Sequence, residues 1–313
     1  MEKIAVLIPC YNEELTIEKV IKDFKSELPE AEIYVYNNNS RDNSYEIAKK
    51  SGAIVRNEYK QGKGNVVKAM FEQIDADIYI LVDADDTYPA ESATKLVEAI
   101  RNGADMAVGD RLSNGTYEKE NKRRFHGLGN SLVKNAINFL FKTNLHDIMS
   151  GYRAYNKKFV KNFPILTKSF EIETEMTLHA LDKNYIIKEI PIEYRDRPDG
   201  SVSKLNTMSD GIKVIKTIIT MFKDYRPLKF FGIIAFILLV LGLIIGIPVI
   251  LEFMKTRYVS KVPSAILATG FVMLAFIIEQ CGIVLSTTVK KNKELYELNI
   301  LRYHQLEDLN KKL

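Results

Sequence analysis

The stretch IYILVDADD, residues 78–86, joins a short apolar run to three carboxylates. β-Branched and aromatic residues dominate its first five positions, which predicts a buried strand over 78–82. Asp83 and Asp85, crowded at the end of an apolar strand, are unfavourable unless a cation or hydrogen-bond donors compensate their charge. Their hard oxygen atoms suit Mg²⁺ or Mn²⁺, so the stretch predicts a metal site that would hold a diphosphate. A solvated turn, or a helix cap formed by Asp86 and Thr87, is the alternative.

On either side of this stretch, β-rich runs alternate with segments of helical period. Strands are predicted at 4–8, 32–36, 53–56, 78–82 and 105–109, and helices at 13–28, 41–50, 65–74 and 91–102. The alternation predicts an α/β fold with a mainly parallel sheet that helices cover on both faces. Ligands of such sheets bind at the carboxyl ends of the strands. Polar clusters follow predicted strands at 9–13, 37–40 and 83–86, and we expect them to meet in one crevice.

Residues 112–206 show a less regular pattern. Helices are predicted at 125–141 and 171–181, a polar turn at 146–153, a strand at 186–194 and a basic loop at 195–206. Five apolar residues of the first helix are predicted on one side, for burial in the domain or for docking on a membrane: Phe125, Leu128, Leu132, Ile137 and Phe141. Glu173 and Glu175, at the start of the second helix, are predicted as solvated or capping carboxylates rather than as part of a sugar pocket.

Length, charge and cysteine content exclude several classes of protein. The 313 residues leave room for about two domains. Lys and Arg number 44 against 40 Asp and Glu, which argues against nucleic acid as a partner. With Cys10 and Cys281 as the two cysteines, neither a disulfide framework nor a cysteine-ligated zinc site is expected. The N-terminal apolar run at 4–8 is too short for a signal peptide, so the first domain is expected on the cytoplasmic side.

The C-terminal third contains two long apolar runs. Residues 230–251 carry no charge and match the roughly 20 residues that cross a bilayer. The second run, 265–289, is long enough as well but contains Glu279 and Gln280. An ionisable residue at membrane depth is costly unless it faces protein. A helix–helix contact is therefore predicted there, and the same pair makes a homo-oligomer worth testing.

The segments around the two runs complete the predicted organisation. Before them, apolar residues spaced 4-3-4-3 predict an amphipathic helix that lies flat on a membrane or packs on the sheet: Met208, Ile212, Ile215, Ile219 and Phe222. Basic residues outside both runs predict an integral membrane protein with both termini in the cytoplasm. The predicted units are a globular domain at 1–206, a juxtamembrane helix at 207–228, two transmembrane helices at 229–289 and a cytoplasmic helical tail at 290–313.

A glycine-containing loop, Gln61-Gly62-Lys63-Gly64-Asn65, enters a predicted helix. Its backbone amides and the Lys63 side chain are therefore candidates for binding an anion. The loop is not a Walker loop, because Gly64 is followed by Asn65 and Val66 instead of Lys and Ser or Thr. ATP hydrolysis of the P-loop kind is thus unsupported.

Seven short motifs occur in an order that resembles family 2 glycosyltransferases. They are Pro9-Cys10-Tyr11-Asn12-Glu13-Glu14, Asn37-Asn38-Asn39-Ser40, Gly62-Lys63-Gly64, Asp83-Ala84-Asp85, Gly109-Asp110-Arg111, Ser150-Gly151-Tyr152-Arg153 and Gly200-Ser201-Val202-Ser203-Lys204. Each motif alone is weak evidence for the family. The occurrence of all seven in this order, followed by two apolar spans, is a specific signal. The chain resembles in particular the polyprenyl-phosphate glycosyltransferases, which are similar to dolichyl-phosphate mannose synthase and carry a two-helix C-terminal anchor.

The resemblance implies a GT-A (Rossmann-like) domain, a nucleotide diphospho-sugar donor, a divalent metal and a polyprenyl phosphate acceptor. The resemblance also implies that Asp83 and Asp85 bind the metal. Asp85 is implied as its direct ligand and as a catalytic residue. The residues implied in nucleotide-sugar binding are Pro9, Tyr11, Glu13, Tyr36, Asn38, Lys63, Asp83 and Ala84.

The resemblance also implies a cluster of cations around the acceptor phosphate. Arg111 is implied in catalysis, and Arg197 and Lys204 are implied as ligands of the lipid phosphate. Arg153 and Arg195 are further candidates for the lipid phosphate, because arginine can hold a phosphate bidentately. A phosphate monoester has its second pKa near 6, so it needs charge screening more than a general base. Asp147 is therefore expected to orient the nucleophile or these cations, with a turn residue that bonds its own backbone as the alternative.

Some positions depart from the mannose-synthase pattern. Asn37 and Asn38 stand where that pattern has two Asp, and Thr87 stands where it has a Gln metal ligand. The asparagine pair favours uridine over guanosine in the donor.

The resulting hypothesis is an inverting transfer of one sugar from UDP-glucose or UDP-N-acetylglucosamine to undecaprenyl or dolichyl phosphate. A processive polysaccharide synthase is a weaker alternative, because such chains have a Gln-X-X-Arg-Trp element and this chain has no Trp. The third hypothesis is a catalytically silent membrane scaffold or sugar-nucleotide sensor.

Overall fold

The computed structural model describes residues 2–113, 126–166, 172–197 and 210–310. It divides into two compact units, Met1–Gly211 and Ile212–Leu313. The predicted boundary after residue 206 and the predicted phosphate ligand Lys204 both lie outside the described residues.

The first unit is built on a seven-stranded sheet in the order β3-β2-β1-β4-β6-β5-β7. The strands are β1 (Ile4–Cys10), β2 (Glu32–Asn37), β3 (Ile54–Asn57), β4 (Ile78–Leu81), β5 (Met106–Asp110), β6 (Arg153–Asn156) and β7 (Ile187–Pro191). Among these described strands, β6 alone runs antiparallel to its neighbours, β4 and β5. The prediction of a mainly parallel α/β sheet is confirmed.

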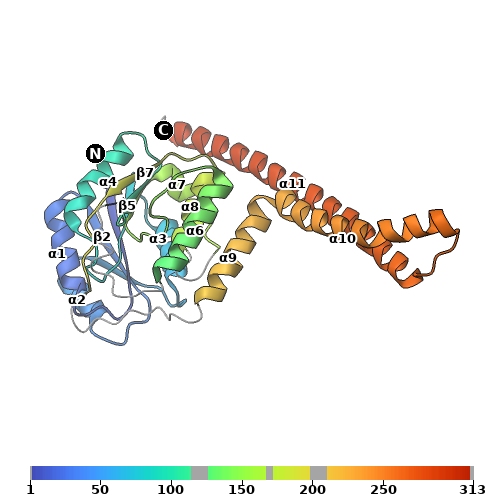
Figure 1. Ribbon diagram of the computed structural model, residues 1–313. Helices are drawn as coiled ribbons and strands as arrows, with labels where there is room; N and C mark the ends of the chain where they lie inside the picture. The colour runs from blue at the N-terminus through green and yellow to red at the C-terminus, as the bar shows by residue number, and fades with distance from the viewer. Residues whose placement is uncertain (1, 114–125, 167–171, 198–209, 311–313) are drawn as a thin grey trace. The chain divides into compact units, whose positions relative to one another are not determined.

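Helices cover both faces of this sheet (Figure 1). One face carries α1 (Ile17–Glu27), α2 (Ser44–Lys50) and α4 (Ala93–Arg101), and the other carries α3 (Lys63–Gln73), α7 (Lys157–Asn162) and α8 (Ile172–Asp182). The strands alternate their side chains between the two layers. In β4, Ile78 and Ile80 join the core beneath α1 and α4, whereas the Tyr79 ring lies 6.2 Å from Phe71 of α3.

Strand β6 was not predicted, because its sequence Arg-Ala-Tyr-Asn begins with a charged residue and resembles the turn expected at 146–153. The position of β6 between β4 and β5 determines which residues lie at the sheet edge where those two strands end. Since β6 is antiparallel, it begins where its neighbours end. Residues 150–152 therefore enter the sheet at the same edge as the acidic stretch after β4.

Helix α6 (His126–Phe141) corrects one prediction about its apolar residues. Ile137 is fully buried, but Leu132 is 54% exposed. The two residues are five positions apart, which turns about 140° around an α-helix and places them on different faces. The prediction that Leu132 and Ile137 lie on one side of the helix is therefore wrong.

The second unit contains α9 (Asp210–Tyr225) from Ile212 onward, α10 (Pro227–Thr256) and α11 (Val262–Asn310). Among the described helices, α10 and α11 are the two that are long and apolar enough to cross a membrane. Most of their apolar side chains are exposed, unlike those of a core helix in a soluble protein. Helix α11 continues unbroken from the apolar segment into the charged tail, as predicted.

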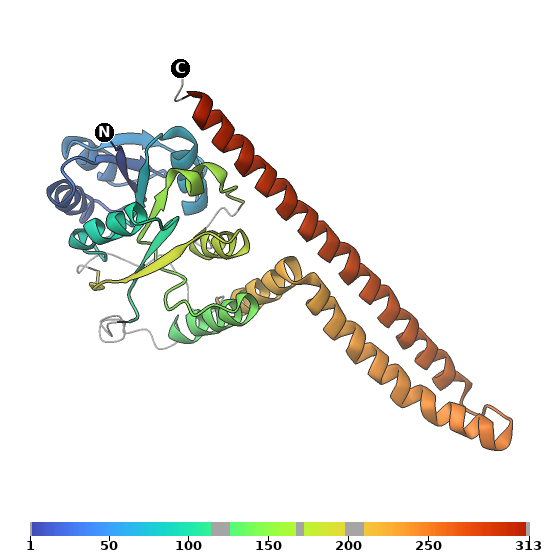
Figure 2. The same cartoon turned by 90° about the horizontal axis from the view of Figure 1, so that it is seen from above.

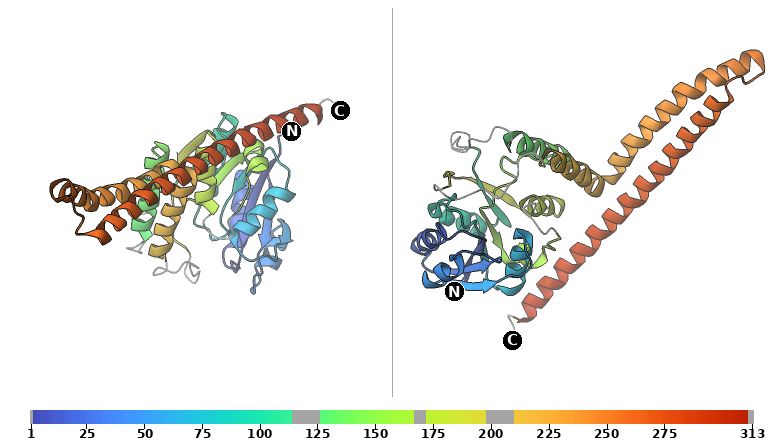
Figure 3. Two further views of the ribbon diagram at one scale, coloured as in Figure 1. Left: turned by 90° about the vertical axis from the view of Figure 1, so that its right-hand side faces the viewer. Right: turned by 90° about the horizontal axis from the view of Figure 1, so that it is seen from below.

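Helices α10 and α11 lie side by side (Figures 2 and 3). Glycines allow this close approach, because a Cβ on Gly242 would lie 2.8 Å from Val272 and one on Gly282 would lie 3.0 Å from Phe231. A Glu279 carboxylate oxygen lies 3.6 Å from the corresponding position on Gly232. Glu279 therefore faces α10, as the predicted helix–helix contact requires.

A buried histidine in α8 should make the first unit sensitive to acid. The His179 ring is packed 4.9 Å from Phe163 and 5.9 Å from Tyr185. Burial, assisted by the charge of Lys183, lowers its pKa to about 4. An unfolded histidine binds a proton below about pH 6.5, so protonation favours the unfolded chain between that pH and about 4.

We therefore expect the wild type to lose about 2 kcal/mol of unfolding free energy between pH 7.5 and pH 5.0 through this one group. A His179→Phe variant should lack that loss. Thermal unfolding of the two full-length proteins in detergent at both pH values measures the difference. Equal losses in both proteins would show that His179 is not responsible.

Candidate active site

The acidic pair lies just after β4, where neighbouring loops hold it in place. The Thr16 hydroxyl donates to the carbonyl oxygen of Ala84 at 2.7 Å, which joins the segment after β1 to this turn. The Thr87 hydroxyl donates to Asp85 Oδ1 at 2.7 Å. Asp85 is only 5% exposed. Burial and the charge of Asp83 raise the pKa of Asp85, although Arg197 and Thr87 act in the opposite direction.

The alternative of a helix cap at this turn is wrong. The residue that caps the next helical turn, Ala90–Ser92, is Pro89, and no side chain bonds there. Asp86 instead pairs with Lys19 of α1 at 2.7 Å. Thr87, the departure from the mannose-synthase pattern, is a hydrogen-bond donor to Asp85 in this structure.

Lys63, at the start of α3, connects Asp83 to Glu173, a carboxylate that was predicted to be solvated or capping. Its ammonium lies 2.5 Å from Asp83 and 2.6 Å from Glu173 of α8. Burial alone would lower the pKa of Lys63, but the two carboxylates outweigh it and raise the pKa well above its ordinary value. Glu173 is 5% exposed, so its prediction as a solvated or capping group is wrong.

Gly151 fits closely against Asp83 and Lys63. A Cβ at residue 151 would lie 2.6 Å from Asp83 Oδ2 and 3.2 Å from Lys63 Nζ. The backbone N–H of Gly151 donates to the Tyr88 hydroxyl at 2.9 Å. The segment before β6 therefore approaches the acidic turn closely because it has no side chain at this position.

Arg111 and Asp147 form a two-pronged ion pair beside this turn. Arg111 Nε and one terminal nitrogen donate to the two Asp147 carboxylate oxygens at 2.7 and 2.9 Å. The guanidinium also lies 5.6 Å from the Tyr194 ring centre. Burial would raise the pKa of Asp147, but Arg111 lowers it below its usual value. An ionised, paired carboxylate is suited to orienting Arg111 rather than to taking a proton.

The predicted phosphate ligands differ in their surroundings. Arg197 lies 2.5 Å from Asp85 and 3.9 Å from Glu13. Arg195 pairs with Glu91 at 3.2 Å near the surface.

Arg153 is placed where it does not fit the predicted role. It is fully buried, and its guanidinium donates to the carbonyl oxygens of Ser150 and Ile148 and to the Thr177 hydroxyl. The charge is therefore used inside the domain, where it joins β6 to α8. The structure therefore does not support Arg153 as a ligand of the acceptor phosphate.

Two residues predicted to bind the nucleotide sugar, Asn38 and Tyr36, also have side chains that make contacts inside the domain. Asn38 is 3% exposed. Its amide donates to the carbonyl oxygens of Glu58 and Lys60 and accepts from Gly62, so its side chain holds the loop before α3. Tyr36 is 1% exposed, with its hydroxyl bonded to Gln73. Their side chains shape the sheet edge instead of facing a ligand.

The predicted residues at the end of β1 remain partly accessible. Pro9, Tyr11 and Glu13 are intermediate in exposure. The Glu13 backbone N–H donates to the Ser44 hydroxyl at 2.8 Å, and Asn12 adopts a left-handed conformation with φ of 53°. The turn therefore brings Glu13 toward Arg197 and the acidic pair.

The charge balance at this edge fits a divalent cation. Five described carboxylates lie on or beside the acidic turn, namely Asp83, Asp85, Asp86, Glu13 and Glu173, and the cations that the structure pairs with them are Lys19, Lys63 and Arg197. This set has more negative than positive groups. Asp83 and Asp85 offer the hard oxygen atoms that Mg²⁺ and Mn²⁺ prefer.

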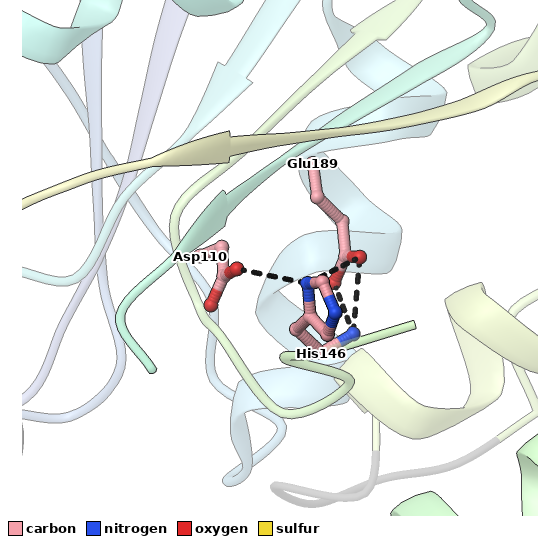
Figure 4. Close-up of side chains that lie close together, drawn as sticks. All are labelled: Asp110, His146 and Glu189. Carbon is pink, nitrogen blue, oxygen red and sulfur yellow. Dashed lines mark hydrogen bonds and ion pairs between the residues drawn. The ribbon is translucent and has the colours of Figure 1, made fainter. Parts of the chain in front are cut away.

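A second group with suitable ligand atoms lies at β5 and β7 (Figure 4). One ligand atom each from Asp110, His146 and Glu189 lies within 4.8 Å of the others. This group was not predicted, because its residues are far apart in sequence and match no spacing motif.

Comparison with known proteins agrees with this architecture. The family model "Glycosyl transferase family 2" matches residues 5–163. The dolichyl-phosphate hexose transferase of Haloferax volcanii is 30% identical over 225 residues, which cover 72% of this chain and 96% of that protein. Glycosyltransferase AglJ of the same organism is 28% identical over 294 residues, which cover 94% and 96%.

A solved structure shares the fold at lower identity. Glucosyl-3-phosphoglycerate synthase of Mycobacterium tuberculosis, in complex with Mn²⁺, UDP and phosphoglyceric acid, superposes with a TM-score of 0.58 at 19% identity. The match covers 71% of this chain and 78% of that one. The chain therefore belongs to glycosyl transferase family 2, is a glycosyltransferase with a GT-A-like domain, and is similar to the polyprenyl-phosphate subgroup of that family.

Proposed function

We propose that this enzyme transfers one sugar, with inversion, from UDP-glucose or UDP-N-acetylglucosamine to a polyprenyl phosphate, either undecaprenyl or dolichyl phosphate. The observation that carries the proposal is the ion pair between Asp85 of the acidic turn and Arg197, at the sheet edge where the Tyr88 hydroxyl also contacts Arg111 and Gly151. The chain also ends in two helices that can cross a membrane. Similarity to the dolichyl-phosphate hexose transferase supports the same acceptor class.

In this proposal Asp83 and Asp85 hold Mg²⁺ or Mn²⁺. Bound there, the cation would neutralise the donor diphosphate and stabilise the charge on the departing UDP. Lys63 keeps the Asp83 carboxylate in place from the buried side. The Thr87 hydroxyl does the same for Asp85.

The acceptor is a phosphate monoester that is largely dianionic at neutral pH. Its oxygen can attack without a general base, so the enzyme's main task is to offset repulsion between two anionic substrates. Arg197 lies beside Asp85 and is the leading candidate for the acceptor phosphate. Arg111, fixed by Asp147, is proposed to bind phosphate oxygens during transfer.

The apolar helices α10 and α11 explain how the enzyme would reach its acceptor. A polyprenyl chain stays in the bilayer with its phosphate at the surface, so an anchored catalytic domain meets it there. The basic flanks of both helices support an orientation with the catalytic domain and both termini in the cytoplasm.

The direct test uses the full-length protein in detergent or vesicles with radiolabelled UDP- and GDP-sugars. Undecaprenyl phosphate and dolichyl phosphate serve as acceptors, and the corresponding neutral polyprenols are the matched controls. We expect one sugar per lipid from a UDP-sugar, no product with the polyprenols, and loss of transfer in chelator with recovery in Mn²⁺. A growing polymer would support a processive synthase, and no product with any donor would support the silent scaffold.

Two arginines of one segment provide a specific prediction for the acceptor site. Arg197→Ala should raise the KM for polyprenyl phosphate about tenfold or more, because a charge-assisted hydrogen bond contributes about 1.5–3 kcal/mol. Arg195→Ala, which removes a surface pair with Glu91, should change it less than about threefold. Initial rates against lipid and UDP-sugar concentration separate the two substrates. A larger effect of Arg197→Ala on the donor KM would reassign Arg197 to the donor.

A further inference from the structure

We propose that Glu189 is a positioning residue for transfer, which holds the Arg111–Asp147 pair in place by anchoring the backbone of residues 146–147. The proposal rests on the proposed function in one respect, namely that Arg111 binds phosphate. Glu189 was not among the predicted site residues, and it touches neither the acidic turn nor Arg111 in the described contacts.

The first step is the contact between Glu189 and the loop. Glu189 lies on β7, opposite Val108 of β5 in the sheet register. Its Oε1 accepts from the backbone N–H groups of His146 and Asp147, both at 2.8 Å, and its Oε2 lies 3.0 Å from the His146 nitrogen. The carboxylate therefore fixes two consecutive peptide groups of a loop to a strand.

The second step runs from the loop to Arg111. The Asp147 whose N–H is held by Glu189 uses both carboxylate oxygens on the Arg111 side chain, at 2.7 and 2.9 Å. One of those oxygens also accepts from the Arg111 backbone N–H at 3.1 Å. A displacement of the Asp147 backbone is thus transmitted directly to the guanidinium.

An equivalent anchor acts on the other partner. Asp110, at the end of β5, accepts from the backbone N–H groups of Leu112 and Ser113 at 2.8 and 3.2 Å. Arg111 and Asp147 therefore come from two loops. The loop of Asp147 is held by Glu189 of β7, and the loop of Arg111 is held by Asp110, the residue directly before Arg111 at the end of β5. Between the two anchors lies the His146 ring, with Nδ1 3.5 Å from Asp110 and 3.7 Å from Glu189 (Figure 4).

The same geometry allows a competing role that an experiment can separate. Asp110, His146 and Glu189 could hold a metal ion, and that role requires the negative charge of Glu189. Anchoring requires an acceptor oxygen at the right reach. Glu189→Gln keeps the reach and loses the charge, whereas Glu189→Asp keeps the charge and shortens the side chain by one methylene.

We therefore compare Glu189→Gln, Glu189→Asp and Glu189→Ala in the full-length enzyme, with Lys188→Ala as a matched control at an exposed neighbour on the same strand. Glu189→Asp and Glu189→Ala should lower kcat about tenfold or more, since small misplacements of a catalytic group have large effects. Glu189→Gln should keep about a third or more of the wild-type kcat, because the anchoring oxygen remains. The donor KM should move little in all three.

Two further measurements link Glu189 to Arg111 specifically. Hydrogen exchange of the amides at 146–147 should accelerate in Glu189→Ala and Glu189→Asp but not in Glu189→Gln. In an Arg111→Ala background, Glu189→Ala should cause no further loss, because the two changes act through one group.

The opposite ranking, with Glu189→Gln inactive and Glu189→Asp active, would overturn the anchor in favour of a charge-dependent site. Additive losses with Arg111→Ala, or wild-type kcat in Glu189→Ala, would also overturn it. Failure of the proposed function is separately visible as absence of product from the wild type, and the exchange measurement still tests the anchor in that case.

Discussion

Asp85→Asn is expected to lower sugar transfer by about a thousandfold or more while the protein stays folded and membrane-associated. The substitution keeps the size of the side chain and its bond with Thr87 but removes the negative charge. Metal and electrostatic stabilisation of a departing diphosphate contributes several kcal/mol, and 1.36 kcal/mol is about tenfold in rate. Initial rates with the best UDP-sugar, and Mn²⁺ binding followed by electron paramagnetic resonance, measure both consequences.

The matched control is Asp86→Asn, one residue along the same turn. Asp86 pairs with Lys19 and has φ of 58°, a left-handed conformation that asparagine tolerates well. It should keep near-wild-type transfer and Mn²⁺ binding. Full activity of Asp85→Asn, or equal losses in both variants, would remove the metal role assigned to Asp85.

Lys63→Met is expected to destabilise the first unit by about 3–5 kcal/mol and to abolish transfer. The ammonium is nearly buried between Asp83 and Glu173, and removing one partner of a buried ion pair leaves uncompensated charge. The repulsion between the two carboxylates would also displace Asp83 from the metal site. Thermal or denaturant unfolding, together with the transfer assay, measures both effects.

A second substitution separates stability from activity. Adding Glu173→Gln to Lys63→Met removes one of the unpaired carboxylates, so it should recover part of the lost stability without restoring transfer. Lys68→Met, on the same helix, breaks an exposed pair with Glu72 at 3.9 Å and should change stability by less than about 1 kcal/mol. A Lys63→Met protein as stable as Lys68→Met would show that the contacts of Lys63 with Asp83 and Glu173 do not contribute to stability.

Much of the sheet could be predicted, because β1, β2 and β4 are continuous apolar runs bounded by polar turns. Tyr11, Asn38 and Asp83 follow these runs within two residues of the strand ends. Parallel strands bring such ends together. Strand β6 could not be predicted in this way. Its Arg153 is satisfied by carbonyl groups that are distant from any pattern in the strand itself.

The residues of the site also differ in whether the sequence could predict them. Asp83 and Asp85 were visible because both follow one strand, and local order along the chain is enough to pair them. Glu173 was assigned to solvent because the charges at the start of an isolated helix usually are solvated, and its partner Lys63 is 110 residues away. Tyr36 and Asn38 were placed at the correct strand end, but the direction of their side chains depends on α3 and the loop before it.

Sequence alone determined the α/β class, the acidic turn, the order of the family motifs and the two apolar C-terminal helices, since each depends on neighbours along the chain. Tertiary structure decided which charges are paired: Lys63 with Asp83 and Glu173, Arg111 with Asp147, and Glu189 with the loop that carries Asp147. The physical reason is that the energy of a charge depends on its burial and on partners within a few ångströms. Folding brings those partners together from distant parts of the chain.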